Sequence, residues 1–487
     1  MLLSVRCGIG VAVEKPQTML KLLVAIASYG DSNDRYLARI IQEYRSMSFK
    51  VDIVVFSNIR KNVGEGVEVH VGLPDRDPRS LPFAHKQVFA ERRDEYDLFL
   101  YSEDDILVTE TNIRAFLRAE REMQETEIPG FFRFEESART RSYPEIHGSY
   151  HWDSTSVRSR GEFVIAFFTN EHAACYLLTA RHLWRAIESG GYLVNPHQGR
   201  YDLQCSAATD PYTQCKCEKV IPISHVDEFL VHHLPNKYIG TRWGVQESEF
   251  RRQISTLLKI GVSGFAEKPL LAEEHGLSRP KDYYELPDKE IVSAIKKDTR
   301  TVLSIGCGWG ATEAKLVEGG AVVTAIPMDS VIPGFANVSG VELVYGDLAI
   351  ALKKLTGRQF DCFLFSDILH LVEEPVSVLV SIRELASDGA VIVAKCPNMG
   401  RLRKIWTKAE REQHFVKGDY QTSGFHFSSQ KVLIEWCERA GLRVSWKAHY
   451  FLSRTRQRLA SAMFGLADHL LSEKCLVVAK KEGNVGV

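Results

Sequence analysis

Residues 302–310 read VLSIGCGWG, an apolar run that ends in three glycines, Gly306, Gly308 and Gly310. A buried strand followed by such a turn lets the backbone approach a nucleoside closely, because glycine has no Cβ and the next helix offers free N–H groups. A plain tight turn between a strand and a helix produces the same pattern. The stretch therefore predicts a strand and a turn, with a nucleoside site as a hypothesis.

Further short apolar segments follow the glycine turn at intervals. We predict strands at 321–326, 341–345, 360–365 and 390–394, and a helix at 377–386 before the last of them. Strands that alternate with helices predict a parallel sheet with helices on both faces. In such a sheet, ligands bind at the carboxyl ends of the strands.

Several motifs of residues 281–482 resemble those of the class I methyltransferases that use S-adenosylmethionine, and they come in the same order. Besides the glycine turn, these motifs are Asp282-Tyr283-Tyr284-Glu285-Leu286-Pro287, Gly346-Asp347, Asp367-Ile368-Leu369-His370-Leu371 with Pro375, Cys396-Pro397-Asn398, Gly424-Phe425-His426-Phe427-Ser428 and Ala440-Gly441-Leu442. The resemblance implies a Rossmann-like fold and S-adenosylmethionine as the cofactor. No single motif is decisive, but the combination is specific.

The resemblance also implies roles for individual residues. Gly306, Gly308 and Gly310 would cradle the methionine and ribose parts of the cofactor, and Asp347 would bond the adenine amino group. His370 or His426 would take the proton from an accepting sugar hydroxyl.

Two positions depart from the family pattern. Ser304 stands where an acid commonly precedes the first glycine, and Pro327 stands where the ribose-binding acid is expected. A carboxylate is the natural acceptor for both ribose hydroxyls, and Asp329, two residues later, is the candidate substitute. The usual Leu-Glu-His-Leu is shortened to Leu-His-Leu. A domain that keeps the fold only as a scaffold is the alternative.

The N-terminal half contains a second α/β pattern. We predict a strand at 20–27, a helix at 35–46 and a strand at 51–56. A further apolar and aromatic strand begins at Tyr96 and runs directly into Glu103-Asp104-Asp105. Clustered carboxylates at the end of a buried strand repel one another unless a cation neutralises them, and oxygen ligands suit Mg2+ or Mn2+. A solvated acidic turn is the alternative.

Residues 19–245 resemble, more loosely, glycosyltransferases of the GT-A class, whose acidic motif holds the metal that bridges the phosphates of a nucleotide sugar. The resemblance implies that Glu103 and Asp105 are metal ligands and that Asp202 is the catalytic base. It also implies that a histidine, His232 or His233, binds the metal. It implies a nucleotide sugar donor and a glycan acceptor, either a polysaccharide or a glycolipid.

Some of these assignments have alternatives. Asp202 could instead cap a helix, with Asp227, Glu228 or Glu162 as the base. Adjacent histidines on a strand point to opposite faces, so one could meet the metal while the other packs.

Composition sets limits on the whole chain. Its 487 residues exceed the ~100 to 200 of a typical domain, so we expect two or three domains. We place an α/β domain at 19–245, a helical connector at 246–280 and a second α/β domain at 281–482. A hydrophobic fraction of 45% and a charged fraction of 25% are those of a globular protein. The net charge of −1 offers no broad basic surface for nucleic acid.

Location and cysteine usage are read from the same composition. No apolar run reaches the ~18 residues that span a bilayer, and we expect a cytoplasmic protein, with a peripheral place at membranes that carry glycolipid acceptors left open. Residues 1–18 show no periodic apolar pattern, and we expect no structural role for them. The ten cysteines fit reduced thiols, although Cys205, Cys215, Cys217 and His225 leave a zinc site open.

The sequence therefore predicts a bifunctional enzyme that modifies glycans, with a metal-dependent glycosyltransferase followed by an O-methyltransferase. The rival hypothesis is a scaffold or sensor in which one domain, more readily the methyltransferase-like one, has lost its activity. A third hypothesis has a small molecule or a protein as the methyl acceptor.

Overall fold

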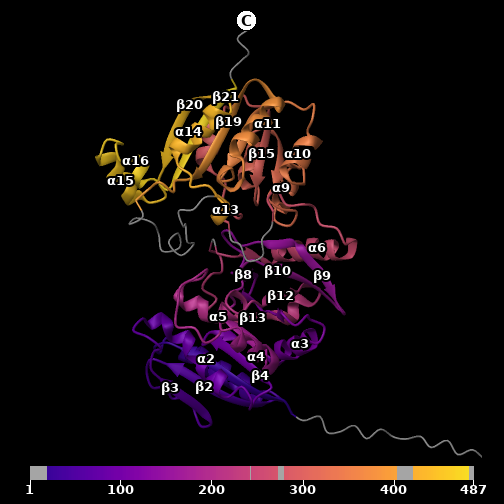
Figure 1. The fold of residues 1–487 in the computed structure, drawn as a ribbon, viewed down its shortest axis with the longest axis vertical. Helices are drawn as coiled ribbons and strands as arrows, with labels where there is room; N and C mark the ends of the chain where they lie inside the picture. The colour runs from indigo at the N-terminus through magenta and orange to yellow at the C-terminus, as the bar shows by residue number, and fades with distance from the viewer. Residues whose placement is uncertain (1–18, 242, 273–278, 403–419, 482–487) are drawn as a thin grey trace, which may run out of the picture.

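The computed structural model describes residues 19–241, 243–272, 279–402 and 420–481. Two α/β parts lie one above the other along the long axis of the molecule, and β15 begins the second of them (Figure 1). The expectation for residues 1–18 lies outside the described residues. Within the described residues, no helix is long and apolar enough to cross a membrane.

The first sheet of the N-terminal part is a five-stranded, largely parallel sheet in the order β11-β4-β1-β2-β3. Only β11 runs antiparallel to its neighbour. The strands are β1 (Lys21–Ser28), β2 (Lys50–Ser57), β3 (Val67–Val71), β4 (Leu98–Glu103) and β11 (Cys175–Thr179). The apolar runs predicted as strands at 20–27 and 51–56 are β1 and β2, and the run into the acids is β4.

Two smaller mixed sheets complete the N-terminal part, in the orders β6-β12-β10-β9 and β14-β8-β7-β13-β5. Their strands are β5 (Ile106–Leu107), β6 (Glu127–Pro129), β7 (Phe132–Glu136), β8 (Arg141–Tyr143), β9 (Trp152–Arg160), β10 (Phe163–Phe168), β12 (Glu218–Pro222), β13 (Leu230–His233) and β14 (Val245–Gln246). Sequence analysis did not resolve these sheets.

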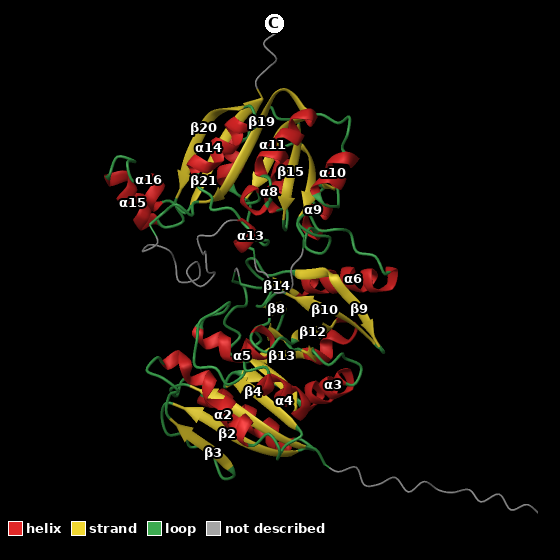
Figure 2. Ribbon diagram, in the orientation of Figure 1, coloured by secondary structure: helices red, strands yellow, loops and turns green. Residues whose placement is uncertain are grey.

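The helices of the N-terminal part lie around these sheets (Figure 2). They are α1 (Asp34–Ser46), α2 (His85–Glu91), α3 (Glu110–Glu120), α4 (Ala180–Glu188), α5 (Leu203–Thr213) and α6 (Glu247–Ser263), with the 3-10 helices η1 (Pro78–Ala84) and η2 (Ile223–Phe229). α6 covers the segment predicted as the connector helix.

The C-terminal part is built on one seven-stranded sheet in the order β17-β16-β15-β18-β19-β21-β20. The first five strands in the chain are parallel and follow the 3-2-1-4-5 order of a doubly wound sheet, whereas β21 runs antiparallel to both neighbours. They are β15 (Thr301–Cys307), β16 (Val322–Pro327), β17 (Glu342–Leu343), β18 (Phe360–Ser366), β19 (Ala386–Pro397), β20 (Leu442–Tyr450) and β21 (Lys474–Lys481). The predicted parallel α/β sheet is confirmed.

Helices connect the strands of this sheet and pack on its faces (Figure 2). They are α7 (Lys289–Ala294), α8 (Ala311–Glu318), α9 (Gly334–Val338), α10 (Leu348–Lys354), α11 (Pro375–Ile382), α13 (Tyr420–Ser423), α14 (Gln430–Arg439), α15 (Arg454–Ala462) and α16 (Asp468–Leu471), with η3 (Leu369–Leu371) and η4 (Arg383–Leu385). The helix predicted at 377–386 ends earlier than expected, because Ala386 already begins β19.

The two parts contact each other through α6. Arg252 of α6 donates hydrogen bonds to the backbone carbonyls of Val331 (2.7 Å) and Ile332 (3.1 Å), which follow β16 in the other part. Val331 is buried in the same hydrophobic cluster as Phe250 of α6. A Cβ at Gly334 would collide with the Arg252 guanidinium. The loop after β16 is therefore held in place by a side chain of the connector helix.

We predict that Arg252→Ala lowers the free energy of unfolding by about 2 kcal/mol, because it removes charged hydrogen bonds to two backbone carbonyls. Arg251→Ala, one residue away on α6, is the matched control: Arg251 makes half-exposed ion pairs with Asp227 and Glu247, which contribute about 1 kcal/mol or less. Chemical denaturation of both variants measures the difference. Equal losses would contradict the proposed clamp.

Candidate functional sites

The carboxyl ends of the parallel strands in the C-terminal sheet bring the predicted cofactor residues to one edge. β15 lies between β16 and β18, so the strand order reverses at β15, and ligands of doubly wound sheets bind at such a switch point. The glycine turn follows β15, Asp329 follows β16 and Asp367 follows β18.

The glycine turn is packed against the chain itself. Gly306 and Gly310 have left-handed backbones, with φ of +79° and +85°. A Cβ at Gly308 would lie 2.5 Å from the carbonyl oxygen of Tyr283, and Trp309 donates its backbone N–H to that same oxygen at 2.7 Å. Residues 281–285 therefore lie directly on the turn. The glycines are required for this close packing, whether or not a ligand binds beside them.

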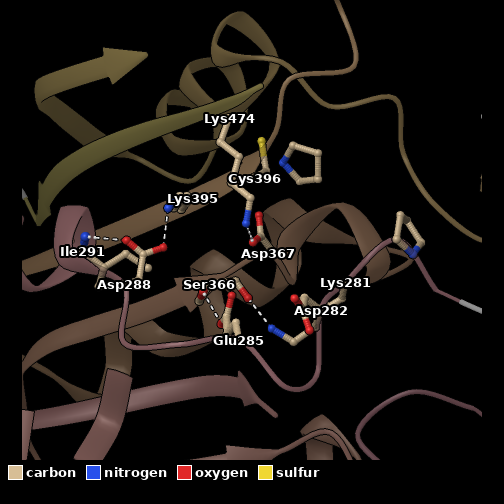
Figure 3. A network of polar contacts seen from close by, with 12 residues as sticks. Lys281, Asp282, Glu285, Asp288, Ile291, Ser366, Asp367, Lys395, Cys396 and Lys474 are labelled. Carbon is tan, nitrogen blue, oxygen red and sulfur yellow. Dashed lines mark hydrogen bonds and ion pairs between the residues drawn. The ribbon is translucent and has the colours of Figure 1, made fainter. Parts of the chain in front are cut away.

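Buried charges at the same edge form a network (Figure 3). Lys281 donates to the Ser366 carbonyl at 2.6 Å, and the Ser366 hydroxyl donates to Glu285 at 3.2 Å. Burial raises the pKa of Glu285 to about 7, against the opposing effect of Lys281. Beside them, Lys474 pairs with Asp367.

Asp367 shows the backbone strain that often marks a functional position. Its φ is +52°, a left-handed conformation that is uncommon for residues other than glycine, and its side chain is almost fully buried. Burial alone would raise the pKa of Asp367, but Lys474, Lys281 and Lys395 hold it below its usual range. Among the described residues, Oδ1 of Asp367 has no hydrogen-bond partner. The sequence motif did not single out this carboxylate.

A second carboxylate missed by sequence analysis lies beneath the glycine turn. Ser304 donates its hydroxyl to Glu313 of α8 at 2.6 Å, and both side chains are buried. The structure thus places an acid from the first turn of α8 beside the position where the sequence has Ser304. The helical spacing from Gly310 to Glu313 could have indicated this, because the third residue after an N-cap lies over the helix start.

Asp329 and Asp347 both bond backbone amides. Asp329 is buried and accepts from the N–H groups of Val331 (2.6 Å) and Ile332 (2.8 Å). It lies beside the glycine turn, because Met328 donates its N–H to the Cys307 carbonyl. Asp347 caps α10 by accepting from Ile350 N at 2.9 Å.

His370 and His426 lie next to each other, since the backbone N–H of His426 donates to the His370 carbonyl at 2.7 Å. Burial lowers the pKa of His370 to about 4, so its ring is neutral at pH 7. Its Nε2 donates to the Pro280 carbonyl at 3.3 Å, which leaves Nδ1 as an acceptor, and Nδ1 has no partner among the described residues. His426 Nε2 donates to the Glu373 carbonyl at 2.9 Å.

A cavity of about 450 Å3 lies between these elements. Leu348, next to Asp347, lines one side, and Leu371 and Glu373, next to His370, line another. The predicted cofactor and base residues themselves do not line this cavity; Leu348 and Leu371 are only the chain neighbours of Asp347 and His370.

The N-terminal sheet has its own switch point, between β1 and β4. A cavity of about 580 Å3 opens at the carboxyl ends of these strands. Its lining combines the acids Glu103, Asp104 and Asp105 with the cationic residues Arg79, Arg133 and Lys237, the histidines His172 and His233, and Tyr29 after β1.

The acids of this cavity differ in their partners. Asp104 accepts from Ser28 (2.7 Å) and Asn33 (2.8 Å). Glu103 is half-buried, and desolvation of its carboxyl together with the charge of Asp105 raises its pKa to about 8. Among the described residues, Oε1 of Glu103 has no hydrogen-bond partner. A cation placed here would relieve both the burial of this carboxyl and its repulsion from Asp105.

His233 and His232 are separated as adjacent strand residues must be. His233 lies 3.4 Å from Asp105 and 2.6 Å from Glu135. His232 lines no part of the cavity; it stacks on Phe134 and bonds Asn236 at 3.0 Å.

The remaining acids predicted for this site bond elsewhere. Asp202 caps α5 by accepting from Cys205 N at 2.9 Å, the alternative that the sequence left open. Asp227 pairs with Arg251, and Glu228 and Glu162 pair with Arg118, all near the surface.

The positions of the described side chains limit where a metal ion could be bound. Within the parts of the chain that the structure describes, no group of three or more His, Cys, Asp or Glu side chains is placed to hold a metal ion. This applies to the acidic cavity and to the zinc alternative at Cys205, Cys215, Cys217 and His225. A metal at Glu103 and Asp105 would take its other ligands from a diphosphate or from water, as Mg2+ commonly does.

Comparisons with known proteins concern the C-terminal part. Its sheet order is that of a Rossmann-like α/β domain, and residues 286–479 match the family model described as "Methionine biosynthesis protein MetW". The C-terminal part is thus similar to this family, over less than half of the chain. No curated protein matches the chain. The family match does not extend to the N-terminal half, where the glycosyltransferase resemblance stays a prediction.

Solved structures similar to the chain include two methyltransferases. An S-adenosylmethionine-dependent methyltransferase from Archaeoglobus fulgidus is 18% identical, with a TM-score of 0.31, over 39% of this chain and 90% of that one. One from Mesorhizobium loti is 19% identical, with a TM-score of 0.30, over 39% of this chain and 96% of that one.

We predict that Gly308→Ala lowers the free energy of unfolding by about 2 kcal/mol or more, because the new Cβ would collide with the backbone of Tyr283. Gly400→Ala is the control in the same part of the chain, since a Cβ there would meet its nearest atoms at 3.5 Å, an ordinary contact. Thermal and chemical denaturation compare the two. A Gly308→Ala variant as stable as Gly400→Ala would show that the segment at Tyr283 does not rest on the turn.

Proposed function

We propose that the C-terminal part transfers a methyl group from S-adenosylmethionine to an acceptor hydroxyl. One observation carries the proposal: the glycine turn and Asp329 lie side by side at the switch point of the sheet, and a cavity is lined by Leu371, the chain neighbour of His370. Within the described part of the chain, Oδ1 of Asp367 and Nδ1 of His370 have no hydrogen-bond partner, and such polar atoms suit a polar ligand.

The chain's residues would share the work as follows. Asp329 would bond the ribose hydroxyls, and Asp347 would accept from the adenine amino group. The network around Asp367 and Glu285 would hold the aminoacyl end of the cofactor. When bound, S-adenosylmethionine supplies a methyl group that is activated by its sulfonium charge. His370 would take the acceptor's proton on Nδ1, although its pKa of about 4 makes it a weak base at pH 7, and His426 is the second candidate base.

We predict that Asp329→Asn weakens S-adenosylmethionine binding roughly ten- to a hundredfold, because it removes charge-assisted hydrogen bonds of ~1.5 to 3 kcal/mol. The amide oxygen still accepts from Val331 and Ile332, so folding should be preserved. Titration calorimetry measures the affinity, with the exposed Asp388→Asn as control.

Two results would speak against this assignment. If the wild-type chain fails to bind at millimolar cofactor, the methyltransferase proposal falls and the scaffold alternative stands. If Asp329→Asn binds as tightly as wild type, the ribose contact alone is wrong.

We propose further that the N-terminal part transfers a sugar from a nucleotide sugar to a glycan, so that both activities serve glycan modification. The observation that supports it is the raised pKa of Glu103 beside Asp105, in a cavity that also presents Arg79 and Lys237. Glu103 and Asp105 would hold Mg2+ or Mn2+, which neutralises charge on the leaving diphosphate. Arg79 and Lys237 would contact phosphate oxygens.

The catalytic base of the sugar transfer is less defined. Asp202 begins α5, whose residues Gln204 and Cys205 line the cavity, so its carboxylate could reach an acceptor only by giving up the cap of the helix. His233 is the metal-side histidine of this proposal, because it bonds Asp105.

We predict that Asp105→Asn abolishes Mn2+-dependent hydrolysis of a panel of nucleoside diphosphate sugars and leaves S-adenosylmethionine binding unchanged. The exposed Asp94→Asn is the control for the loss of one charge from the same part of the chain. Hydrolysis assays and calorimetry should use the same preparations. Hydrolysis that persists in Asp105→Asn at the wild-type rate would refute the metal assignment.

A further inference from the structure

The segment from Leu452 to Leu471, here called the C-terminal hairpin, stands out from the sheet beside β20 as the helices α15 and α16 (Figure 1). Its own buried apolar cluster is small and consists of Ala460, Ala467 and Leu471, with Phe451 packed against it. The hairpin therefore keeps small side chains inside.

Large apolar side chains lie on its outside. The exposed fractions are 75% for Leu452, 52% for Leu459, 46% for Met463, 94% for Phe464 and 79% for Leu466. Single exposed apolar residues are common, but five within fifteen residues of one protruding element mark an interaction surface. Their exposure would be costly to no purpose if the hairpin were only structural.

The most exposed of these residues is also conformationally strained. Phe464 has φ of +53°, a left-handed backbone that is rare for a bulky residue. The turn between α15 and α16 thus presents an aromatic ring to solvent where Gly or Asn would fit with less strain. Strain of this kind persists where a side chain has a role at that position.

Two exposed arginines of α15 precede the apolar tip, and the carboxylate of Asp468 lies beside Gly465 in the turn. Arg454 and Arg458 of α15 are exposed, while Arg456 pairs with the buried Glu473. A cavity of about 440 Å3 lies against the hairpin, with His469 of α16 in its wall. Lys431, Lys447 and His449 also line this cavity, and none of its lining residues is acidic.

We propose that the C-terminal hairpin docks the protein on a membrane that contains anionic lipids. Phe464 and Leu466 enter the boundary between headgroups and acyl chains, Arg454 and Arg458 lie against the negative surface, and the cationic cavity takes a lipid phosphate. Exposed apolar residues flanked by arginines have this partner chemistry, because apolar burial and attraction to anionic lipid act together. The proposal depends on neither proposed activity.

Vesicle co-sedimentation of the full chain tests the proposal. Wild type should bind vesicles of phosphatidylcholine with phosphatidylglycerol, and bind pure phosphatidylcholine vesicles at least tenfold more weakly. Phe464→Asn/Leu466→Asn should reduce binding at least tenfold without lowering the melting temperature, since Asn accepts the left-handed turn. Arg454→Glu/Arg458→Glu and Lys447→Glu should each weaken binding to anionic vesicles. Neither variant should bind with a steeper dependence on salt concentration than wild type.

The control variant is Phe265→Asn, which removes another exposed aromatic residue, outside the hairpin. It should bind vesicles like wild type. The proposal is overturned if wild type does not bind anionic vesicles, or if the double Asn variant binds as tightly as wild type. Sedimentation velocity tests whether a second copy of the chain covers the hairpin instead. If wild type forms dimers, Phe464→Asn/Leu466→Asn dissociates them and wild type does not bind vesicles, the membrane proposal is also overturned.

Discussion

The C-terminal site depends on two backbone hydrogen bonds of Tyr283. Its carbonyl accepts from Trp309 in the glycine turn, and its N–H donates to the Gly148 carbonyl in the other part of the chain. One residue thus links the glycine turn to the N-terminal half. Together with Arg252, which holds the loop after β16, this contact makes the C-terminal site dependent on the rest of the chain. The separate sheets would suggest two fully independent domains. These contacts show instead that the two parts are joined.

Electrostatics distinguishes the two candidate sites. In the C-terminal network the buried acids have lysine partners: Lys474 pairs with Asp367, and Lys395 pairs with Asp288. In the N-terminal cavity, burial and Asp105 together keep the pKa of Glu103 at about 8, even though Arg133 and His233 lower it. Asp367 and Asp288 are therefore compensated by lysines, whereas Glu285 in the same network, like Glu103 in the N-terminal cavity, keeps a raised pKa.

Apolar runs made the central strands of both parts predictable, because a parallel strand buried on both faces reads as a continuous hydrophobic segment. The two mixed sheets of the N-terminal part escaped because most of their strands, β9 and β10 apart, have only two to five residues. Glu313 was missed because it reaches Ser304 through the fold and not through a motif. Asp202 was assigned to catalysis from its place in the chain, but its carboxylate bonds the start of α5. Motif position predicted which strand end a residue follows, and could not predict what its side chain contacts.

Hydrogen exchange of the full chain, with and without S-adenosylmethionine, tests the central claim most directly. If the cofactor binds at the switch point beneath the Tyr283 segment, exchange should slow at 281–285, at the glycine turn, at 329–332 and at the start of α10, where each segment borders the proposed site. Peptides from the N-terminal sheet should exchange at unchanged rates. Unchanged exchange at all four segments, at cofactor concentrations up to millimolar, would contradict the account.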